Sequence, residues 1–377
     1  MNANDSYDLA IVGGGLAGLS LSIQLARAGW KVVVFEKEFY PFHKVCGEYI
    51  SMESREFLTG LGLPLNEWKL PVIEKLFVTS PNGESIRASL PLGGFGVSRY
   101  KLDAALADIA RETGVILLEH TKVHGIQWED GKHRIQTTNG TFAATVTAAC
   151  YGKKSNLDVK WKRSFVLDNP VTNYVGVKYH VLADLPDSEI ALHNFPGGYC
   201  GISKIEANRY CFCYLTESEN LKNNKQSISD MEKNILKQNP VLRKILNEMT
   251  VLSEAPVTIA QISFSKKTQV ENHVFCIGDA AGMITPLCGN GMSMALHASK
   301  IAAESIALFF SGRISREEME KSYQKNWNRL FAGRLRTGRI IQRFFGNRFW
   351  SVALIRFLKP FPFLVRVLIR KTHGAPF

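Results

Sequence analysis

Three closely spaced glycines near the start of the chain have the spacing that holds a phosphate group. Gly13, Gly15 and Gly18 form the pattern GxGxxG directly after an apolar run. In such a turn the first glycine permits a tight bend, the second lets the backbone approach a pyrophosphate, and the third lets the helix pack closely on the strand. The helix N-terminus, at Leu16 and Ala17, supplies amide donors and a favourable dipole. We therefore expect a dinucleotide diphosphate here.

One acidic residue indicates which dinucleotide fits this turn. A second predicted strand, 31–35, ends in Glu36, at the distance from the glycines where a carboxylate accepts both hydroxyls of an adenosine ribose. The same carboxylate disfavours a ribose 2′-phosphate. The site is therefore expected to hold FAD or NAD rather than NADP.

A second small-residue turn, far along the chain, separates FAD from NAD. The apolar run 274–277 ends in Gly278 and Asp279, and small residues follow at 280–282. The ribityl hydroxyls of FAD need an acceptor far from the adenine, and Asp279 is placed to be that acceptor. The amides at the start of the long apolar run 293–310 can stabilise negative charge on a flavin. The sequence therefore predicts FAD.

Each of these motifs requires a strand, a turn and a helix, and the strands of such motifs pair in a parallel sheet. The fold class is therefore predicted to be α/β. The insertions between the motifs contain short alternating strands, which suit a sheet that covers the flavin. The tail has the pattern of amphipathic helices. The expected organisation is a Rossmann-like FAD-binding lobe (1–75, 99–155 and 266–310), an interleaved β-sheet substrate lobe (76–98 and 156–265) and a C-terminal segment of basic amphipathic helices (311–377).

Composition is that of a globular enzyme in a reducing compartment. The 377 residues are 45% apolar and 21% charged, which supports a large core. The seven cysteines form no CxxC pair, so neither a disulfide framework nor a metal site is expected. No secretory pattern and no uncharged apolar run long enough to span a bilayer is visible. We expect a cytoplasmic protein, with peripheral attachment to the inner membrane face as an alternative.

The net charge of +12 resides in the C-terminal segment. Residues 311–377 contain fifteen Lys or Arg and three Glu, and no acid follows Glu320. Many of these cations interleave with aromatic and aliphatic residues. One interpretation is a helical cap with a solvated cationic side, which could form a lid over an apolar tunnel. The other is docking to a membrane surface or an acyl carrier protein. Nucleic acid is not expected, because no nucleic-acid-binding module accompanies the charge.

Four segments together resemble one branch of the flavoproteins. They are Gly13–Gly18 with Glu36, His43–Glu48, Ser98–Asp103 and Gly278–Gly291. They resemble the geranylgeranyl-reductase-like branch of the superfamily that also contains aromatic hydroxylases and flavin-dependent halogenases. The resemblance implies that Arg99 lies near the phosphate and ribose of the cofactor and that the loop 43–48 runs close to the flavin ring. The expected cofactor-binding residues are Gly13, Gly15, Leu16, Ala17, Gly18, Glu36, Lys37, Lys44, Cys46, Gly47, Arg99, Val123, Gly278, Asp279, Pro286, Gly289, Gly291 and Met292.

Departures from the family patterns leave several reactions open. The Asp-Gly pair usual in hydroxylases is replaced by residues 149–155, which contain no acid. The Trp-x-Trp-x-Ile segment of tryptophan halogenases is absent, and so is the Trp that follows Gly-Tyr-Gly in prenyl reductases, here residues 198–202. We favour reduction of an activated C=C bond in an apolar lipid-, prenyl- or polyketide-like substrate by hydride from flavin N5. The alternatives are a monooxygenase, a halogenase and a non-catalytic flavin sensor.

Three side chains are candidates for the catalytic groups. Cys46 and Glu48 are candidate proton donors on the loop that the resemblance places near the flavin, although a thiol such as Cys46 is more often a packing residue than a catalytic group. Tyr199 lies on the segment 196–202, which the resemblance implies is a substrate-lobe strand facing the flavin. No second GxGxxG is present, so the electron donor is expected to be NAD(P)H that visits the flavin transiently, or another reduced protein.

Overall fold

The glycine-rich turn lies in a largely parallel sheet in the computed structural model, which describes residues 6–167 and 174–377. The strands of this sheet are β1 (Ser6–Val12), β2 (Val32–Phe35), β6 (Ile116–Leu118), β7 (Val123–Glu129), β8 (Lys132–Thr137), β9 (Gly140–Ala149), β16 (Val270–Glu271) and β17 (Val274–Cys276). Their order is β16-β17-β9-β1-β2-β6, with β7 joined through β8 to β9. Because β6, β2, β1, β9 and β17 are mutually parallel, their carboxyl ends meet at one edge.

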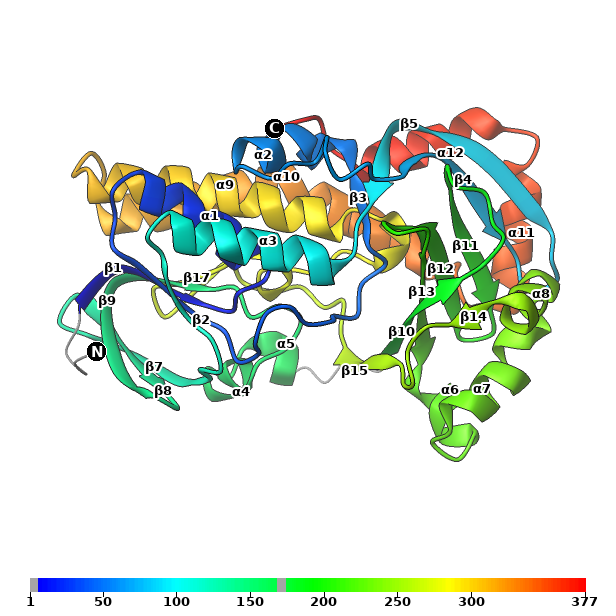
Figure 1. Cartoon of the computed structure of the whole chain (residues 1–377), viewed down its shortest axis with the longest axis horizontal. Coiled ribbons are helices and arrows are strands. Elements are labelled where there is room, and N and C mark those ends of the chain that lie inside the picture. The colour runs from blue at the N-terminus through cyan, green and yellow to red at the C-terminus, as the bar shows by residue number, and fades with distance from the viewer. Residues whose placement is uncertain (1–5, 168–173) are drawn as a thin grey trace.

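Alternation along β1 determines what packs on each face of the first sheet. Leu9 and Ile11 belong to the main core, under α1 (Leu16–Arg27), α3 (Arg99–Glu112) and α9 (Gly291–Phe310). Ala10 and Val12 face the opposite core, which the antiparallel β7–β9 ribbon closes. The three helices lie together on one side of the sheet in Figure 1. The predicted α/β fold with a Rossmann-like lobe is confirmed.

A second, mostly antiparallel sheet forms the other lobe (Figure 1). Its strands are β3 (Tyr49–Ser51), β4 (Val72–Thr79), β5 (Ser85–Gly96), β10 (Tyr174–Leu182), β11 (Glu189–Phe195), β12 (Gly198–Lys204), β13 (Tyr210–Glu217), β14 (Thr250–Val251) and β15 (Val257–Ile262). The order is β14-β10-β13-β12-β11-β4-β5-β3, and β15 pairs with β10. The sequence placed β3 and the start of β4 in the FAD lobe, but both pair with β5.

Three C-terminal helices run across both lobes. α10 (Arg316–Gln342) packs on α9, and α11 (Arg348–Leu358) and α12 (Pro362–Thr372) lie against the long strand β5 (Figure 1). Arg356 on α11 forms an ion pair with Glu84 beside β5, with Nη2 and Oε1 2.6 Å apart. The remaining elements are η1 (Met52–Ser54), α2 (Arg55–Gly60), α4 (Asn156–Lys160), α5 (Ser164–Leu167), α6 (Ser218–Asn223), α7 (Ile228–Asn234), η2 (Leu236–Gln238), α8 (Pro240–Glu248), η3 (Gly278–Ala280) and η4 (Pro286–Cys288).

Neither a membrane-spanning helix nor a cluster of metal ligands is present in the described ranges 6–167 and 174–377. No helix there has the length and apolar character needed to cross a membrane. No group of three or more His, Cys, Asp or Glu side chains in these ranges is arranged to hold a metal ion.

Candidate functional site

The turn after β1 requires glycine for steric reasons. Gly13 has φ of +104°, and a Cβ added there would lie 2.6 Å from the carbonyl oxygen of Cys150 on the neighbouring chain segment. A Cβ on Gly18 would collide with the backbone oxygen of Gly13. The turn therefore packs tightly against β9 and α1, which aligns the first amides of α1 toward the turn. Gly15, the residue before α1, makes no side-chain cap, so the amides of Leu16 and Ala17 have no side-chain acceptor from that position.

Glu36 is buried beside this turn in an arrangement that suits a ribose. Its Oε2 accepts a hydrogen bond from the Gly14 amide at 2.9 Å, and its Oε1 accepts one from the Glu38 amide at 3.1 Å. Each carboxylate oxygen has a further lone pair, so acceptor capacity remains for hydroxyl groups. Val123 begins β7 close by, since the Thr121 amide donates to the Glu36 backbone oxygen.

The Lys37 side chain points into solvent. It pairs with Glu38 at 3.2 Å and is 67% exposed. It therefore lies next to the ribose position without being directed into the turn, and its cofactor contact stays a prediction.

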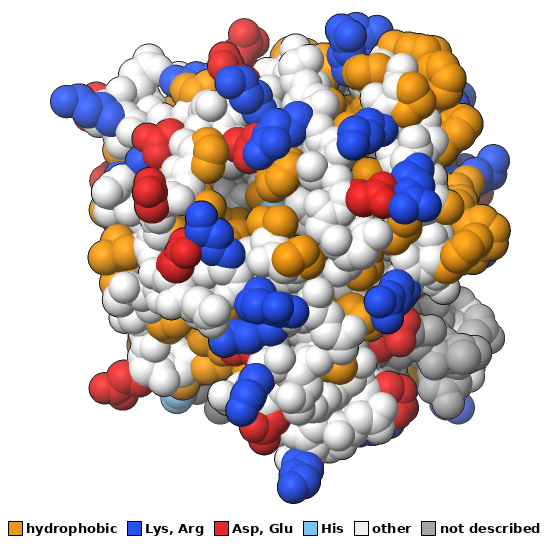
Figure 2. All heavy atoms as spheres, turned by 90° about the vertical axis from the view of Figure 1, so that its right-hand side faces the viewer, with side chains coloured by type: hydrophobic (Ala, Val, Ile, Leu, Met, Phe, Trp, Pro, Cys, Tyr) orange, Lys and Arg blue, Asp and Glu red, His pale blue; other side chains and the backbone are white. Residues whose placement is uncertain are grey.

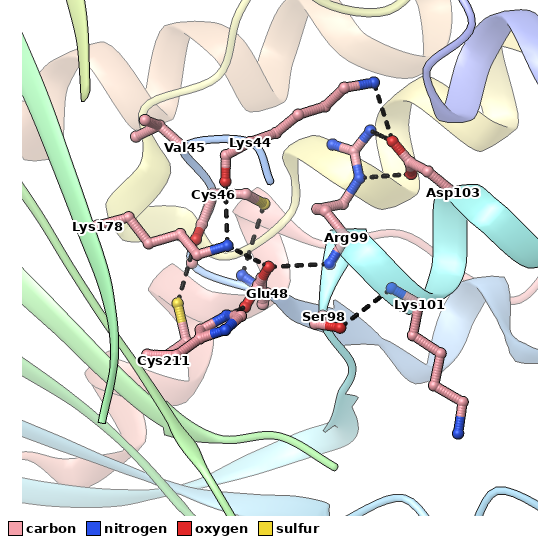
Figure 3. Close-up of polar contacts among 12 residues, drawn as sticks. Lys44, Val45, Cys46, Glu48, Ser98, Arg99, Lys101, Asp103, Lys178 and Cys211 are labelled. Carbon is pink, nitrogen blue, oxygen red and sulfur yellow. Dashed lines mark hydrogen bonds and ion pairs between the residues drawn. The ribbon is translucent and has the colours of Figure 1, made fainter. Parts of the chain in front are cut away.

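Two cations lie over the glycine turn, where a diphosphate would need them. A Cβ at Gly15 would be 3.6 Å from Arg99 Nη2 and 3.7 Å from Lys44 Nζ. Asp103 holds both cations: Arg99 Nε and Nη2 each lie 2.7 Å from its carboxylate oxygens, and Lys44 Nζ lies 2.9 Å away. Burial would raise the pKa of Asp103, but Arg99 and Lys44 outweigh burial and lower it. The two cations and one anion leave a net positive charge beside the helix N-terminus (Figure 3).

Glu48 lies at the centre of a buried ion cluster where the two lobes meet (Figure 3). Its Oε1 accepts from Lys178 Nζ at 2.5 Å and from the Arg99 amide at 2.9 Å, and its Oε2 is 2.6 Å from His180 Nε2. Burial would raise the pKa of Glu48, but the His180 hydrogen bond and the Lys178 charge outweigh burial and lower it. Glu48 is therefore an ionised carboxylate with three partners, which is a poor proton donor. This geometry favours a positioning role over the proton-donor role considered from the sequence.

The loop that carries Cys46 and Gly47 is held through its backbone carbonyls. Lys178 Nζ donates to the Lys44 oxygen at 3.1 Å, Cys211 Sγ to the Cys46 oxygen at 3.2 Å, and Ser203 Oγ to the Gly47 oxygen at 3.2 Å. The donors come from β10, β13 and β12, so the second sheet determines the position of this loop. The Cys46 side chain is half-buried, and its Sγ accepts from the Glu48 amide at 3.5 Å. Whether Cys46 takes part in catalysis stays a prediction.

Sequence reasoning missed Lys178 and His180, although a signal for them exists. Both lie on β10, an apolar strand in which Val175, Val177 and Val181 are buried. A lysine with almost no exposed surface inside such a strand requires an anionic partner. The sequence offered several acids, and only the paired strands identify Glu48 as that partner.

The second motif forms the short turn η3 against α1 and α9. A Cβ on Gly278 would lie 3.4 Å from the Cβ atoms of Ala17 and Ala295, so the two motifs meet here. Two buried cations that the sequence analysis did not single out support η3: Lys267 Nζ donates to the Asp279 backbone oxygen at 2.9 Å, and Arg163 Nη1 donates to the Ala280 oxygen at 3.0 Å.

The segment 286–292 links η3 to α9 and lies beside the second sheet. Tyr199 on β12 accepts a hydrogen bond from the Leu287 amide at 2.9 Å. Gly289 follows Pro286 with φ of +63° and lies close to the ring of Tyr49 on β3. α9 then begins at Gly291, and Met292 in its first turn is buried. The two lobes therefore meet at this loop, next to the start of α9.

An apolar cavity opens directly beyond this loop. It encloses about 900 Å³, including space open to solvent, between the second sheet and the helices α10–α12. Leu287, Cys288 and Gly289 line the end nearest the FAD lobe. The apolar side chains elsewhere in its wall are Leu76, Val78, Ile86, Leu90, Ile190, Leu192, Ile341, Phe345, Leu354, Ile355, Leu358, Val365, Leu368 and Ile369.

The described residues fit FAD along a continuous path. The path runs from the buried acceptor Glu36, past the uncapped start of α1 and the two cations near Gly15, to the junction of Gly278 with α9. It ends near the loop 286–289 and the cavity. A buried acid, a cationic turn and a second helix N-terminus in this order match the ribose, the diphosphate and the flavin end of FAD.

Comparisons with known proteins agree with this assignment. A family model described as an FAD binding domain matches residues 6–331. Conditioned medium factor receptor 1 of Dictyostelium discoideum is 25% identical over 368 residues, covering 86% of this chain and 68% of that protein. Digeranylgeranylglycerophospholipid reductase 2 of Methanopyrus kandleri is 26% identical over 347 residues, covering 86% and 83%. The structure of a flavin-dependent brominase superposes with a TM-score of 0.81 at 19% identity, covering 99% of this chain and 94% of the brominase, which shows a shared fold. The resemblance inferred from the sequence is confirmed.

Proposed function

We propose, from the premise that this chain belongs to the FAD-binding-domain family and is an FAD-dependent oxidoreductase, that it reduces an activated C=C bond in a long apolar substrate. The observation that carries the proposal is the cavity beside the loop 286–289. Its wall is mostly aliphatic and aromatic, with few polar side chains to orient a polar ligand. A small polar substrate would leave most of this surface without contacts, whereas a hydrocarbon chain would fill it.

The flavin end of the cofactor path meets one end of this cavity. When bound, FAD supplies a hydride from N5 of its ring. The chain's own contribution is to hold the substrate: Leu287 and Cys288 lie where the reacting end would be, and the helices α11 and α12 enclose the distal part. Exclusion of water by this wall favours transfer of hydride over side reactions.

A proton must also reach the substrate carbon, and one proposed source is Tyr199, which packs against Phe345 of the cavity wall. Its hydroxyl accepts from the Leu287 amide, so its own proton stays available. Burial raises the pKa of Tyr199 well above its ordinary value, so this hydroxyl is a weak acid that would give up its proton only to a strongly basic carbanion. Its ring packs edge-on against Phe345 in the cavity wall, with centroids 5.8 Å apart. Cys46, half-buried on the neighbouring loop, is the second candidate. The electron donor is proposed to be NAD(P)H.

The test is an anaerobic single-turnover experiment with the full FAD-loaded chain. The flavin is reduced chemically, a detergent-solubilised prenyl lipid with allylic double bonds is added, and flavin reoxidation is followed by absorbance while the product is weighed by mass spectrometry. We expect reoxidation in step with the gain of two hydrogens per reduced bond. Reoxidation that needs oxygen and yields an oxygenated product would instead establish a monooxygenase.

A variant pair links turnover to the cavity. Leu354→Trp fills the cavity from α11, and Phe357→Trp places the same side chain on the exposed face of the same helix. The first should slow reduction of the prenyl lipid without changing the flavin absorbance, and the second should behave as the unmodified chain. Equal turnover by both variants would refute the assignment of the cavity as the substrate site.

A further inference from the structure

The helices α11 and α12 are apolar on two opposite faces. On the inner face, Leu354, Ile355 and Leu358 of α11 line the cavity. On the outer face of the same helix, Phe349 is 71% exposed and Phe357 is 58% exposed. α12 repeats this arrangement, with Val365, Leu368 and Ile369 lining the cavity and Phe363 and Val367 exposed. The outer face is therefore apolar surface that none of the described residues buries.

The exposed aromatic side chains form two groups of neighbouring rings instead of being scattered singly. Phe349 and Trp350 have ring centroids 5.3 Å apart. Phe361 lies 5.9 Å from Phe357 and 6.3 Å from Phe363. We call this surface the aromatic face; it consists of Ile340, Phe349, Trp350, Phe357, Phe361, Phe363 and Val367. Contiguous apolar surface of this kind marks an interaction site, whereas single exposed hydrophobic residues do not.

Cations accompany the aromatic face, and one of them, Arg356, is paired with the acid Glu84. The exposed cations of this part of the chain are Arg336, Arg343, Arg348, Arg356, Lys359, Arg366, Arg370 and Lys371. No Asp or Glu follows Glu320 in the sequence. Figure 2 faces the end of the molecule where α11 lies, and it shows hydrophobic side chains gathered along the upper right edge with Lys and Arg side chains beside them.

We propose that the aromatic face binds the surface of an anionic lipid bilayer. Phenylalanine and tryptophan side chains enter the boundary between headgroups and acyl chains, and arginine and lysine side chains meet the lipid phosphates. Pairing with a second copy of the chain would bring two cationic faces together, which disfavours that occupant. The described helices do not span a membrane, so the attachment is peripheral.

This docking deepens the proposed function, on which the next step rests. Because α11 and α12 separate the aromatic face from the cavity, docking places the cavity wall against the lipid phase. An apolar substrate then passes between the two helices from the bilayer without crossing water. The substrate class would be lipids that reside in the membrane.

Vesicle co-sedimentation of the FAD-loaded full chain tests the docking without any turnover. We expect binding to vesicles of phosphatidylcholine with phosphatidylglycerol, and weak binding to phosphatidylcholine alone. The triple variant Phe349→Ser, Phe357→Ser, Phe363→Ser should lower the partition coefficient by about 100-fold, because three aromatic side chains lose their transfer into the lipid boundary. The matched control is Phe39→Ser, since Phe39 is 62% exposed on the FAD lobe and should not affect binding.

Tryptophan fluorescence gives a second measurement at the aromatic face itself. Trp350 is 51% exposed, so docking should shift its emission to the blue and brominated lipids should quench it. Trp350→Phe should remove this signal and retain sedimentation with vesicles.

Several outcomes would overturn the docking proposal. The first is that the chain does not bind anionic vesicles, and the second is that the triple variant binds them as well as the unmodified chain does. The third is that the unmodified chain forms a dimer, does not bind vesicles, and becomes a monomer when the triple variant is made. The fourth is that the chain selectively binds an acidic acyl carrier protein instead of vesicles. Turnover then separates the two proposals. If the triple variant reduces detergent-solubilised substrate normally but fails with vesicle-embedded substrate, entry from the bilayer is supported. If vesicles bind but no substrate is reduced, only the proposed function fails.

Discussion

Replacing Glu48 with glutamine should destabilise the protein far more than an isosteric change normally does. The side chain has no exposed surface and accepts hydrogen bonds from Lys178, His180 and the Arg99 amide. A glutamine keeps the volume but removes the negative charge and one acceptor oxygen. His180 can adapt to the glutamine by changing its tautomer. Lys178 cannot adapt, because its side chain is 1% exposed and its positive charge would be left without an anionic partner.

The magnitude follows from the buried charge that remains. Removing one partner of a buried ion pair costs about 3–5 kcal/mol, because the other charge is left without compensation. Removing both partners restores much of this loss, so Glu48→Gln with Lys178→Met should be more stable than Glu48→Gln alone. The expected coupling energy between the two sites is about 2 kcal/mol or more, within the range for residues in one ion-pair network.

Urea unfolding of the four proteins, followed by circular dichroism at neutral pH, gives the double-mutant cycle. The Lys178→Met single variant completes it, and Lys321→Met serves as the control because Lys321 pairs with Glu317 at the surface, where the two side chains are 71% and 75% exposed. The control should leave the unfolding free energy almost unchanged. If Glu48→Gln stays within about 0.5 kcal/mol of the unmodified chain, or if the two losses simply add, the buried ion cluster does not stabilise the junction of the lobes.

Three further predictions address the cofactor turn, the loop at the cavity and the response to acid. Gly15→Ala should fold normally, because an added Cβ meets no atom closer than 3.6 Å, but should weaken FAD binding measured by flavin fluorescence by about tenfold or more; unchanged affinity would contradict the diphosphate position. Tyr199→Phe leaves the buried Leu287 amide without its acceptor and should lower the unfolding free energy by about 1–3 kcal/mol, and an unchanged urea midpoint would show that this bond does not hold the loop. Burial lowers the pKa of His193 to about 3, whereas the same side chain in the unfolded chain titrates near pH 6.5. Its contribution to the unfolding free energy is therefore constant above about pH 6.5 and falls by about 1.4 kcal/mol per pH unit from there toward pH 3. His193→Asn should therefore flatten the acid side of the stability profile, and an identical slope would disprove this contribution.

Local chemistry made the cofactor lobe predictable from the sequence. A glycine turn, the helix after it and the acid Glu36 lie within one stretch of chain, so their spacing alone determines how they meet. The place of Asp279 in a small-residue turn after a strand was predictable for the same reason, and its contact with the cofactor stays a prediction. The structure places both motifs together through the contact of Gly278 with Ala17.

Only the tertiary structure decided which residues far apart along the chain contact one another. Alternation along a strand indicates which face a residue occupies, but not which residue lies opposite it. From the sequence, Glu48 was therefore a candidate proton donor. The structure shows Lys178 and His180 of β10 in contact with its carboxylate. Residues 311–377 were likewise predicted as basic amphipathic helices, whereas in the fold α11 and α12 use one apolar face for the cavity and leave a second exposed. Burial of a helix face depends on what packs against it, and that is a property of the whole fold.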